Sequence, residues 1–342
     1  MILLSKRFFL PGWLWIIVCI TACDTNDDQV IEIHGDTMGT SYHVKVIQKN
    51  RSISEKTLEE GIDHTLSVID QKMSTYREDS ELSAINQAEV GQWINVSADT
   101  LAVLTLAQNI SRETHGSFDV TIAPLVNLWG FGPTKVLQDN IPAQSKIRQA
   151  LSHVGYQHLR IKPGYPQVMK DTQVMLDFSA IAKGFAVDRV AQYLESSGFV
   201  NYLVEVGGEI RTGGTKPDGR LWKIAIESPL PLVRRAEKII ALSDVALATS
   251  GDYRNFFEQD GKHYSHTIDP ATGKPVTHTL ASVTVIDPSC ARADALATAL
   301  MVMGPTKGMQ FVETHDIAAF FIVKQGNSFK EDYSLKFGEY LN

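Results

Sequence analysis

Hydrophobic residues follow two spacings along the chain, and the change from one to the other predicts where strands and helices lie. Apolar side chains at every second position indicate a strand with one buried face. Two such segments, 29–34 and 42–47, flank Met38-Gly39-Thr40 near the start of the chain. The same pattern predicts strands over these segments: 93–96, 174–178, 202–206, 222–226, 239–242, 263–268, 282–286 and 318–323.

Helical spacing separates many of these strands. Ser52 and Glu55 form a capping-box pattern, and apolar residues then recur every three or four positions from Leu58 to Ile69. Further helices are predicted over these segments: 97–113, 143–154, 182–196, 292–303 and 305–313. Strands and helices mix without strict alternation, which predicts an α+β fold rich in antiparallel sheet.

The first residues have the organisation of an export signal. A basic start, Lys6-Arg7, precedes an apolar run over 8–20 that is shorter than the ~20 residues needed to span a bilayer. Ile20-Thr21-Ala22-Cys23 resembles the lipobox of bacterial lipoproteins, which implies lipidation of Cys23. In this resemblance, Asp24 implies retention at the inner membrane, facing the periplasm. Without lipidation, the same signal would give a soluble periplasmic protein.

These features divide the chain into a signal peptide over 1–22, a lipidated tether over 23–30 and one folded part over 31–342. With 44% hydrophobic residues, that part has enough apolar side chains for one large domain or two closely packed ones. A net charge of −7 and the lack of any basic run argue against a nucleic-acid-binding surface. The cysteines are Cys19, Cys23 and Cys290. Loss of the first and lipidation of the second would leave Cys290, expected as a buried small residue, without a disulfide partner.

The junction between the strand over 174–178 and the following helix carries the first candidate site. Backbone N–H groups at a helix start are unpaired and attract anions, Ser179 is placed to cap them, and Lys183 adds a positive charge one turn later. A phosphate group, and hence a nucleotide, fits this junction. An ordinary capped helix whose lysine faces water is the alternative.

A second candidate site lies in an alanine-rich helix. Asp294 and Thr298 are four residues apart and therefore share one helical face. Their carboxylate and hydroxyl oxygens suit Mg²⁺, which prefers oxygen ligands and usually completes its shell with phosphate and water. Helix capping and packing would explain the same pair without a metal.

The third candidate, His266, precedes a turn initiated by Pro270 and ended by Gly273. A histidine at the end of a strand is suited to act as a general base near neutral pH, although a structural turn explains the same residues. The glycine pair Gly207-Gly208 marks a place where backbone can pass close to a ligand. Neither a G-x-G-x-x-G fingerprint nor a Walker-A sequence occurs.

Taken together, these segments carry a family resemblance. In order along the chain they read Met38-Gly39-Thr40-Ser41-Tyr42, Met73-Ser74-Thr75-Tyr76, Gly116-Ser117-Phe118-Asp119, Asp177 to Gly184, Val206-Gly207-Gly208-Glu209, Thr249-Ser250-Gly251-Asp252, His266 to Gly273 and Asp294 to Thr298. This series resembles the motifs of the ApbE family, the FAD:protein FMN transferases, over residues 31–323. The resemblance implies a single α+β domain with T-fold-like mixed or antiparallel sheets and packed helices.

The resemblance also implies an activity. FAD is cut at its pyrophosphate in a Mg²⁺-dependent reaction, FMN is esterified to a threonine of a target protein, and AMP leaves. Implied targets are flavin-carrying subunits of the sodium-translocating NADH:quinone oxidoreductase and related electron-transport complexes. Two alternatives remain: a Mg²⁺-dependent FAD pyrophosphatase that transfers FMN to water, and a non-catalytic FAD-binding lipoprotein.

Site residues follow from the matching positions. The implied FAD-binding set is Met38, Tyr76, Ser117, Phe118, Asp119, Asp177, Lys183 and Ile268. The implied metal ligands are the Ala180 carbonyl, Asp294 and Thr298, with Ala297 as a candidate second carbonyl. His266 is the candidate base for the acceptor threonine.

Overall fold

A computed structural model describes residues 29–48, 53–133, 141–230, 235–253, 256–259, 262–326 and 328–341. The predicted signal peptide, Cys23 and Ser52 lie outside these ranges. Over the described part of the chain, no helix is both long enough and apolar enough to cross a membrane.

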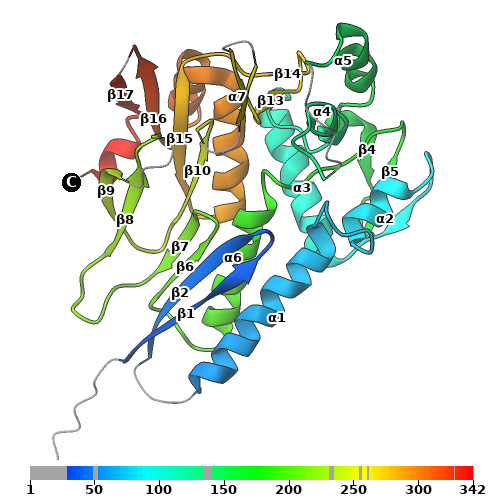
Figure 1. Ribbon diagram of the computed structural model, residues 1–342. Coiled ribbons are helices and arrows are strands. Elements are labelled where there is room, and N and C mark those ends of the chain that lie inside the picture. The colour runs from blue at the N-terminus through cyan, green and yellow to red at the C-terminus, as the bar shows by residue number, and fades with distance from the viewer. Residues whose placement is uncertain are drawn as a thin grey trace, which may run out of the picture.

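An antiparallel sheet of eight strands forms the centre of the fold (Figure 1). In spatial order it contains β1 (Gln29–Thr37), β2 (Thr40–Gln48), β6 (Tyr202–Val206), β7 (Glu209–Gly213), β10 (Ala246–Gly251), β15 (Leu280–Asp287), β16 (Ala318–Gln325) and β17 (Ser328–Tyr333). Strands β1 and β2 join through Met38 and Gly39, which have φ values of 48° and 74°. Positive φ at both positions is typical of a tight hairpin turn, but it is uncommon for methionine.

Each face of the sheet has its own cover (Figure 1). Helices α1 (Glu55–Met73), α6 (Ala182–Ser196) and α7 (Cys290–Thr314) bury one face in the largest hydrophobic core. The hairpin of β8 (Trp222–Glu227) and β9 (Ala236–Leu242) packs with the short helix η2 (Phe337–Tyr340) in a second core that includes residues of β10, β15 and β16. Alternating apolar residues along β16 reach both cores, as strand geometry requires.

The remaining elements complete the fold, and the 16-residue helix Ala98–Glu113 among them packs into the largest core. They are α2 (Glu81–Gln87), α3 (Ala98–Glu113), α4 (Ala123–Leu128), α5 (Gln144–Leu151), η1 (Tyr156–His158), the sheet β3 (Ile94–Asn95), β5 (Gln167–Lys170) and β4 (Leu159–Ile161), and the hairpins β11 (Phe256–Gln259) with β12 (Lys262–Ser265) and β13 (Ile268–Asp269) with β14 (Lys274–Pro275). The predicted α+β fold with extensive antiparallel sheet is therefore confirmed.

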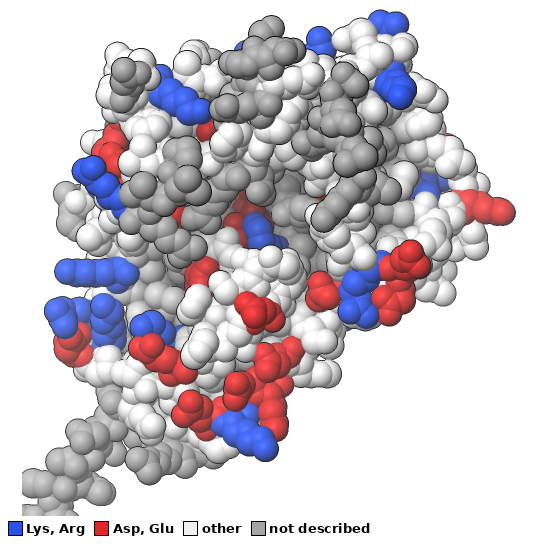
Figure 2. All heavy atoms as spheres, in the orientation of Figure 1, with Lys and Arg blue, Asp and Glu red and all other residues white. Residues whose placement is uncertain are grey.

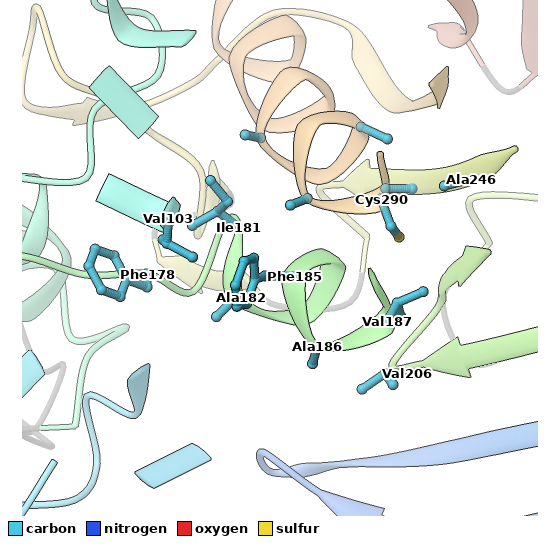
Figure 3. Close-up of a cluster of buried hydrophobic side chains, with 14 of the residues drawn as sticks. Val103, Phe178, Ile181, Ala182, Phe185, Ala186, Val187, Val206, Ala246 and Cys290 are labelled. Atoms are coloured by element: carbon cyan, nitrogen blue, oxygen red, sulfur yellow. The ribbon is translucent and has the colours of Figure 1, made fainter. Parts of the chain in front are cut away.

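Helices α6 and α7 pack closely against each other where α7 begins (Figure 3). A Cβ atom added to Gly184 would lie 2.4 Å from the Cys290 carbonyl oxygen, so glycine permits the close approach. The Asp188 carboxylate accepts hydrogen bonds from the backbone N–H groups of Cys290 and Ala291, at 3.1 Å each, and from the Ser289 hydroxyl at 2.9 Å. One carboxylate on α6 thus holds the first turn of α7. Cys290 is fully buried, as predicted.

Two local predictions were wrong. The described N-cap of α1 is Ser54, whose hydroxyl accepts from Thr57 N–H, and the predicted cap Ser52 lies outside the described residues. The segment 174–178 makes only an isolated bridge between Met175 and Ile122 instead of a strand in a ladder. The Asn86 side chain donates a hydrogen bond to the Leu176 carbonyl and accepts one from the Leu176 N–H. The backbone of Leu176 therefore needs no neighbouring strand to satisfy it.

The two helices predicted over 292–303 and 305–313 form one broken helix, α7. Gly304 has φ 75° and ψ 179°, and Pro305 has no N–H to donate to the Met301 carbonyl. His278 replaces that donor: its Nε2 lies 2.7 Å from the Met301 oxygen, while its Nδ1 accepts from Leu280 N–H at 3.3 Å. Both bonds require the neutral ring with hydrogen on Nε2.

This histidine makes stability pH-dependent. Burial lowers the pKa of His278, and the opposing effect of the Met301 hydrogen bond does not cancel it; nearby Asp252 raises the pKa and Lys324 lowers it. As the pH falls, the unfolded chain therefore takes up a proton at this histidine before the folded protein does. The contribution of neutral His278 to the free energy of unfolding is fully present above about pH 6.5 and is lost as the pH falls through its lowered folded-state pKa. We expect His278→Gln, which keeps a donor, to reduce the acid loss of stability by up to about 1.4 kcal/mol per pH unit in this window. Urea unfolding between pH 5 and 8 measures this difference, and equal slopes for both proteins would contradict it.

Candidate active site

A single cavity of about 1010 Å³ collects most of the residues predicted from the sequence. It is lined by Tyr76, Ser117, Phe118, Asp119, Asp177, Ala180, Lys183, His266, Ile268, Asp294 and Thr298, among others. Figure 2 shows a hollow near the middle of this face, with acidic and basic atoms together at its floor. Met38 and Ala297 are not among the lining residues, although Thr40 and Ser41 beside Met38 are.

The start of α6 forms one wall, but its cap differs from the prediction. Ser179 does not cap the helix, because its hydroxyl donates to the Asp177 carboxylate at 2.5 Å, as does its backbone N–H at 2.7 Å. The residue at the cap position, Ile181, makes no side-chain cap bond. Instead, Asp294 from α7 accepts the Gly184 N–H at 3.0 Å. Sequence spacing does not reveal a cap supplied from another helix.

Lys183 points into a pair of carboxylates and not into water, so the alternative of an ordinary solvent-facing lysine is wrong. Its Nζ lies 2.8 Å from Glu209 Oε1 and 3.8 Å from Asp294 Oδ1. The lysine side chain is 30% exposed, whereas each carboxylate side chain is only 4% exposed. The positive charge therefore sits at the cavity surface with both negative charges behind it.

Burial and charge act against one another at these three groups. Burial alone would lower the pKa of Lys183, but Asp294 and Glu209 outweigh it and hold the pKa above its ordinary value. Burial raises the pKa of Glu209, with Lys183 opposing the change. The pKa of Asp294 is also raised by burial and opposed by Lys183. The site is thus short of positive charge, which a cation would supply.

The donor set for a metal consists of oxygens only. Ala180, Asp294 and Thr298 all line the cavity, and the Thr298 hydroxyl shares a hydrogen bond of 3.1 Å with that of Ser250. A carboxylate, a hydroxyl and a carbonyl from the turn before α6 fit Mg²⁺ better than a soft metal. In the described ranges, no cluster of three or more His, Cys, Asp or Glu residues suits a metal ion. Ala297 is fully buried inside α7, where its carbonyl has a helical partner at the position of Met301.

The charge of the cavity wall also favours a bound cation. Its described acidic residues are Asp119, Asp177, Glu205, Glu209, Glu227 and Asp294, whereas Lys183 is its one described lysine or arginine. A pyrophosphate would be repelled by this wall on balance. Binding of a doubly charged cation with the phosphates removes that conflict.

The segment 117–119 shapes the wall through the Asp119 carboxylate. Asp119 accepts hydrogen bonds from the Thr121 N–H at 2.8 Å, the Thr121 hydroxyl at 2.7 Å and the Tyr156 N–H at 2.8 Å. These bonds hold the loop in place. Burial raises the pKa of Asp119 and outweighs these bonds, which act to lower it. Phe118 is 2% exposed and belongs to the core. Tyr76, by contrast, is 71% exposed at the cavity, where its ring is open to stacking.

His266 lies between two short strands and lines the cavity. The predicted strand over 263–268 is interrupted there, since β12 ends at Ser265 and β13 begins at Ile268. The ring of His266 lies edge-on to Phe131, with 6.2 Å between centroids. Ile268 is 5% exposed and belongs to the small core beside the cavity.

Some cavity residues were not predicted from the sequence as site residues. Glu209 follows the glycine pair that was noticed, and its place in the segment Val206-Gly207-Gly208-Glu209 is the only sequence signal that pointed to it. His43 and Glu205 form a second pair on the wall, with His43 Nδ1 2.7 Å from a Glu205 carboxylate oxygen. They come from strands β2 and β6, which sequence periodicity cannot pair.

Sequence comparison identifies close relatives of this chain. Residues 38–321 match the ApbE family. The chain is 45% identical over 327 residues to the FAD:protein FMN transferase of Vibrio cholerae serotype O1, covering 95% of this chain and 97% of that protein. It is 42% identical to the FAD:protein FMN transferase of Haemophilus influenzae, with 91% of each chain covered.

Solved structures agree with the sequence matches. The flavin transferase ApbE from Vibrio cholerae superimposes with a TM-score of 0.85 at 45% identity, covering 92% of this chain and all of that one. The apo form of the Pseudomonas stutzeri flavinyl transferase ApbE gives a TM-score of 0.85 at 41% identity, covering 92% of this chain and 97% of that one. Because both comparisons extend over the central sheet and the cavity, this chain belongs to the ApbE family.

Proposed function

We propose that this protein is a Mg²⁺-dependent FAD:protein FMN transferase that esterifies FMN to a threonine of a target protein and releases AMP. One observation carries the proposal. A single cavity brings the Lys183 ammonium, the Asp294 and Thr298 oxygens and His266 together from separate parts of the chain. The membership of the ApbE family places the protein among transferases.

Different residues would have different roles in phosphoryl transfer. Lys183 and the start of α6 would bind the pyrophosphate, while Asp294, Thr298 and the Ala180 carbonyl would hold the metal ion. An ion held by these residues would supply positive charge that neutralises the phosphates and makes the phosphorus more electrophilic. His266 would accept the proton of the threonine hydroxyl as its oxygen forms a bond to the FMN phosphorus. The bond from that phosphorus to the bridging oxygen breaks, and AMP leaves with the electron pair.

Mass spectrometry of an acceptor tests the reaction. A threonine-bearing flavin-acceptor domain of a redox-driven ion pump is incubated with FAD, Mg²⁺ and the protein from Asp24 onward. We expect the acceptor to gain one FMN, and the gain to disappear with a chelator or after substitution of the acceptor threonine by alanine. Free FMN and AMP without labelling, even with several acceptors, would favour the pyrophosphatase. Intact FAD would favour a flavin-binding protein.

The setting of the reaction is part of the proposal. Lipidation at Cys23 would place the enzyme at the inner membrane, facing the periplasm, beside flavin-carrying subunits of the sodium-translocating NADH:quinone oxidoreductase or its electron-transport relatives. Labelled palmitate should enter the full-length protein in bacterial cells but not Cys23→Ser. Equal labelling of both would exclude Cys23 as the site.

A further inference from the structure

We propose that Glu209 is a positioning residue for the transfer reaction. It holds the Lys183 ammonium at the cavity wall, so that Lys183 stays beside the phosphates while Asp294 binds the metal ion. The inference rests on the proposed function, and it assigns a role to a carboxylate that does not itself need to touch FAD.

The burial of Glu209 is not explained by packing. One carboxylate oxygen, Oε1, lies 2.8 Å from Lys183 Nζ, and the other, Oε2, is buried without a hydrogen-bond partner among the described residues. Burying a carboxylate with an unsatisfied oxygen disfavours folding. A residue that breaks a packing rule in this way is more often retained for function than for stability.

The backbone before Glu209 is shaped to let Lys183 reach it. Gly207 and Gly208 have φ values of 61° and 105°, which disfavour other residues. A Cβ on Gly207 would lie 3.2 Å from Lys183 Cδ and 2.9 Å from Thr40 Cγ2. The lysine stem therefore passes directly over the glycine turn, and its charged end meets the first residue of β7.

Charge explains why one carboxylate is not enough. Without a metal ion, Lys183 has two anionic partners, Glu209 at 2.8 Å and Asp294 at 3.8 Å. A cation held by Asp294 would offset the negative charge of that carboxylate and would repel the Lys183 ammonium. Among the described residues, Glu209 is then the remaining ion-pair partner that keeps Lys183 in place.

A double-mutant cycle tests this coupling. We expect Glu209→Gln to lower kcat/KM for FAD about 10- to 100-fold when Lys183 is present, as for loss of a charged hydrogen bond. In the Lys183→Met background the same substitution should change kcat/KM less than about twofold, because the group that Glu209 positions is gone. Equal losses in both backgrounds would overturn the proposal.

Stability measurements separate positioning from a structural role. Thermal unfolding of Glu209→Gln should give a Tm close to that of the parent, whereas a structural acid would lower Tm in both backgrounds. The matched control is the Lys72–Asp99 pair outside the cavity, with Nζ and Oδ2 2.6 Å apart. Asp99→Asn should leave kcat/KM unchanged. If Lys183→Met alone had the kcat/KM of the parent, the proposed contact between Lys183 and the pyrophosphate would be overturned. That part of the proposed function would then fall, which is a different outcome from failure of the Glu209 coupling.

Discussion

Asp294→Asn is expected to lower the rate of FMN transfer in the proposed Mg²⁺-dependent reaction about 100- to 1000-fold, the range for loss of one electrostatic group at a reacting centre. The amide keeps an oxygen that can accept the Gly184 N–H, now made at 3.0 Å, so the contact between α6 and α7 survives. What it loses is the negative charge that a hard cation needs. Single-turnover transfer assays over a range of Mg²⁺ concentrations measure the effect.

The proposed metal dependence provides the control for this variant. If Asp294 binds the ion, part of the lost rate should return at high Mg²⁺, and Mg²⁺ should stabilise the parent protein against heat more than the variant. Full activity at the parent's Mg²⁺ requirement would remove Asp294 from the metal site.

His266→Ala is expected to slow transfer to threonine about 100- to 10,000-fold, the range for loss of a general base. The side chain lines the cavity, where a neutral imidazole can accept the hydroxyl proton. A rate that depends on a general base rises with pH, so the variant should lose the pH dependence that the parent shows. Mass spectrometry of the acceptor at fixed times gives both rates.

A second histidine distinguishes this role from a general effect of substitution. His64 lies on the exposed side of α1, away from the cavity, so His64→Ala should retain the parent rate and pH profile. Transfer by His266→Ala at the normal rate would leave the threonine proton to another group.

Local patterns predicted the elements well, because each depends on a few neighbouring residues. The helix over 182–196 was predicted at its observed bounds, and Ser97 caps α3 in the structure. At two of the places where the prediction failed, a distant group had replaced the local one. Asn86 satisfies the backbone of Leu176, and Asp294 takes the cap position that Ser179 was expected to fill.

The same distinction applies to the candidate site. Asp294 and Thr298 were identified together because four residues make one helical turn. Glu209 was not recognised as a site residue, because its significance lies in the Lys183 ammonium, which belongs to another element. Spacing within one segment reveals ligands on a shared face, whereas a positioning contact between segments needs the fold.

The pairing of β2 with β6 has a consequence for how the enzyme becomes active. His43 and Glu205 meet across 162 positions of sequence, and the cavity draws its wall from residues as far apart as Thr40 and Val302. Contacts of such long range form late, because closing a long loop must precede them. A refolding chain should therefore acquire helix signal before it can bind FAD. The recovery of FAD binding would show when the sheet is complete. A partly folded chain would have secondary structure but no enzymatic activity.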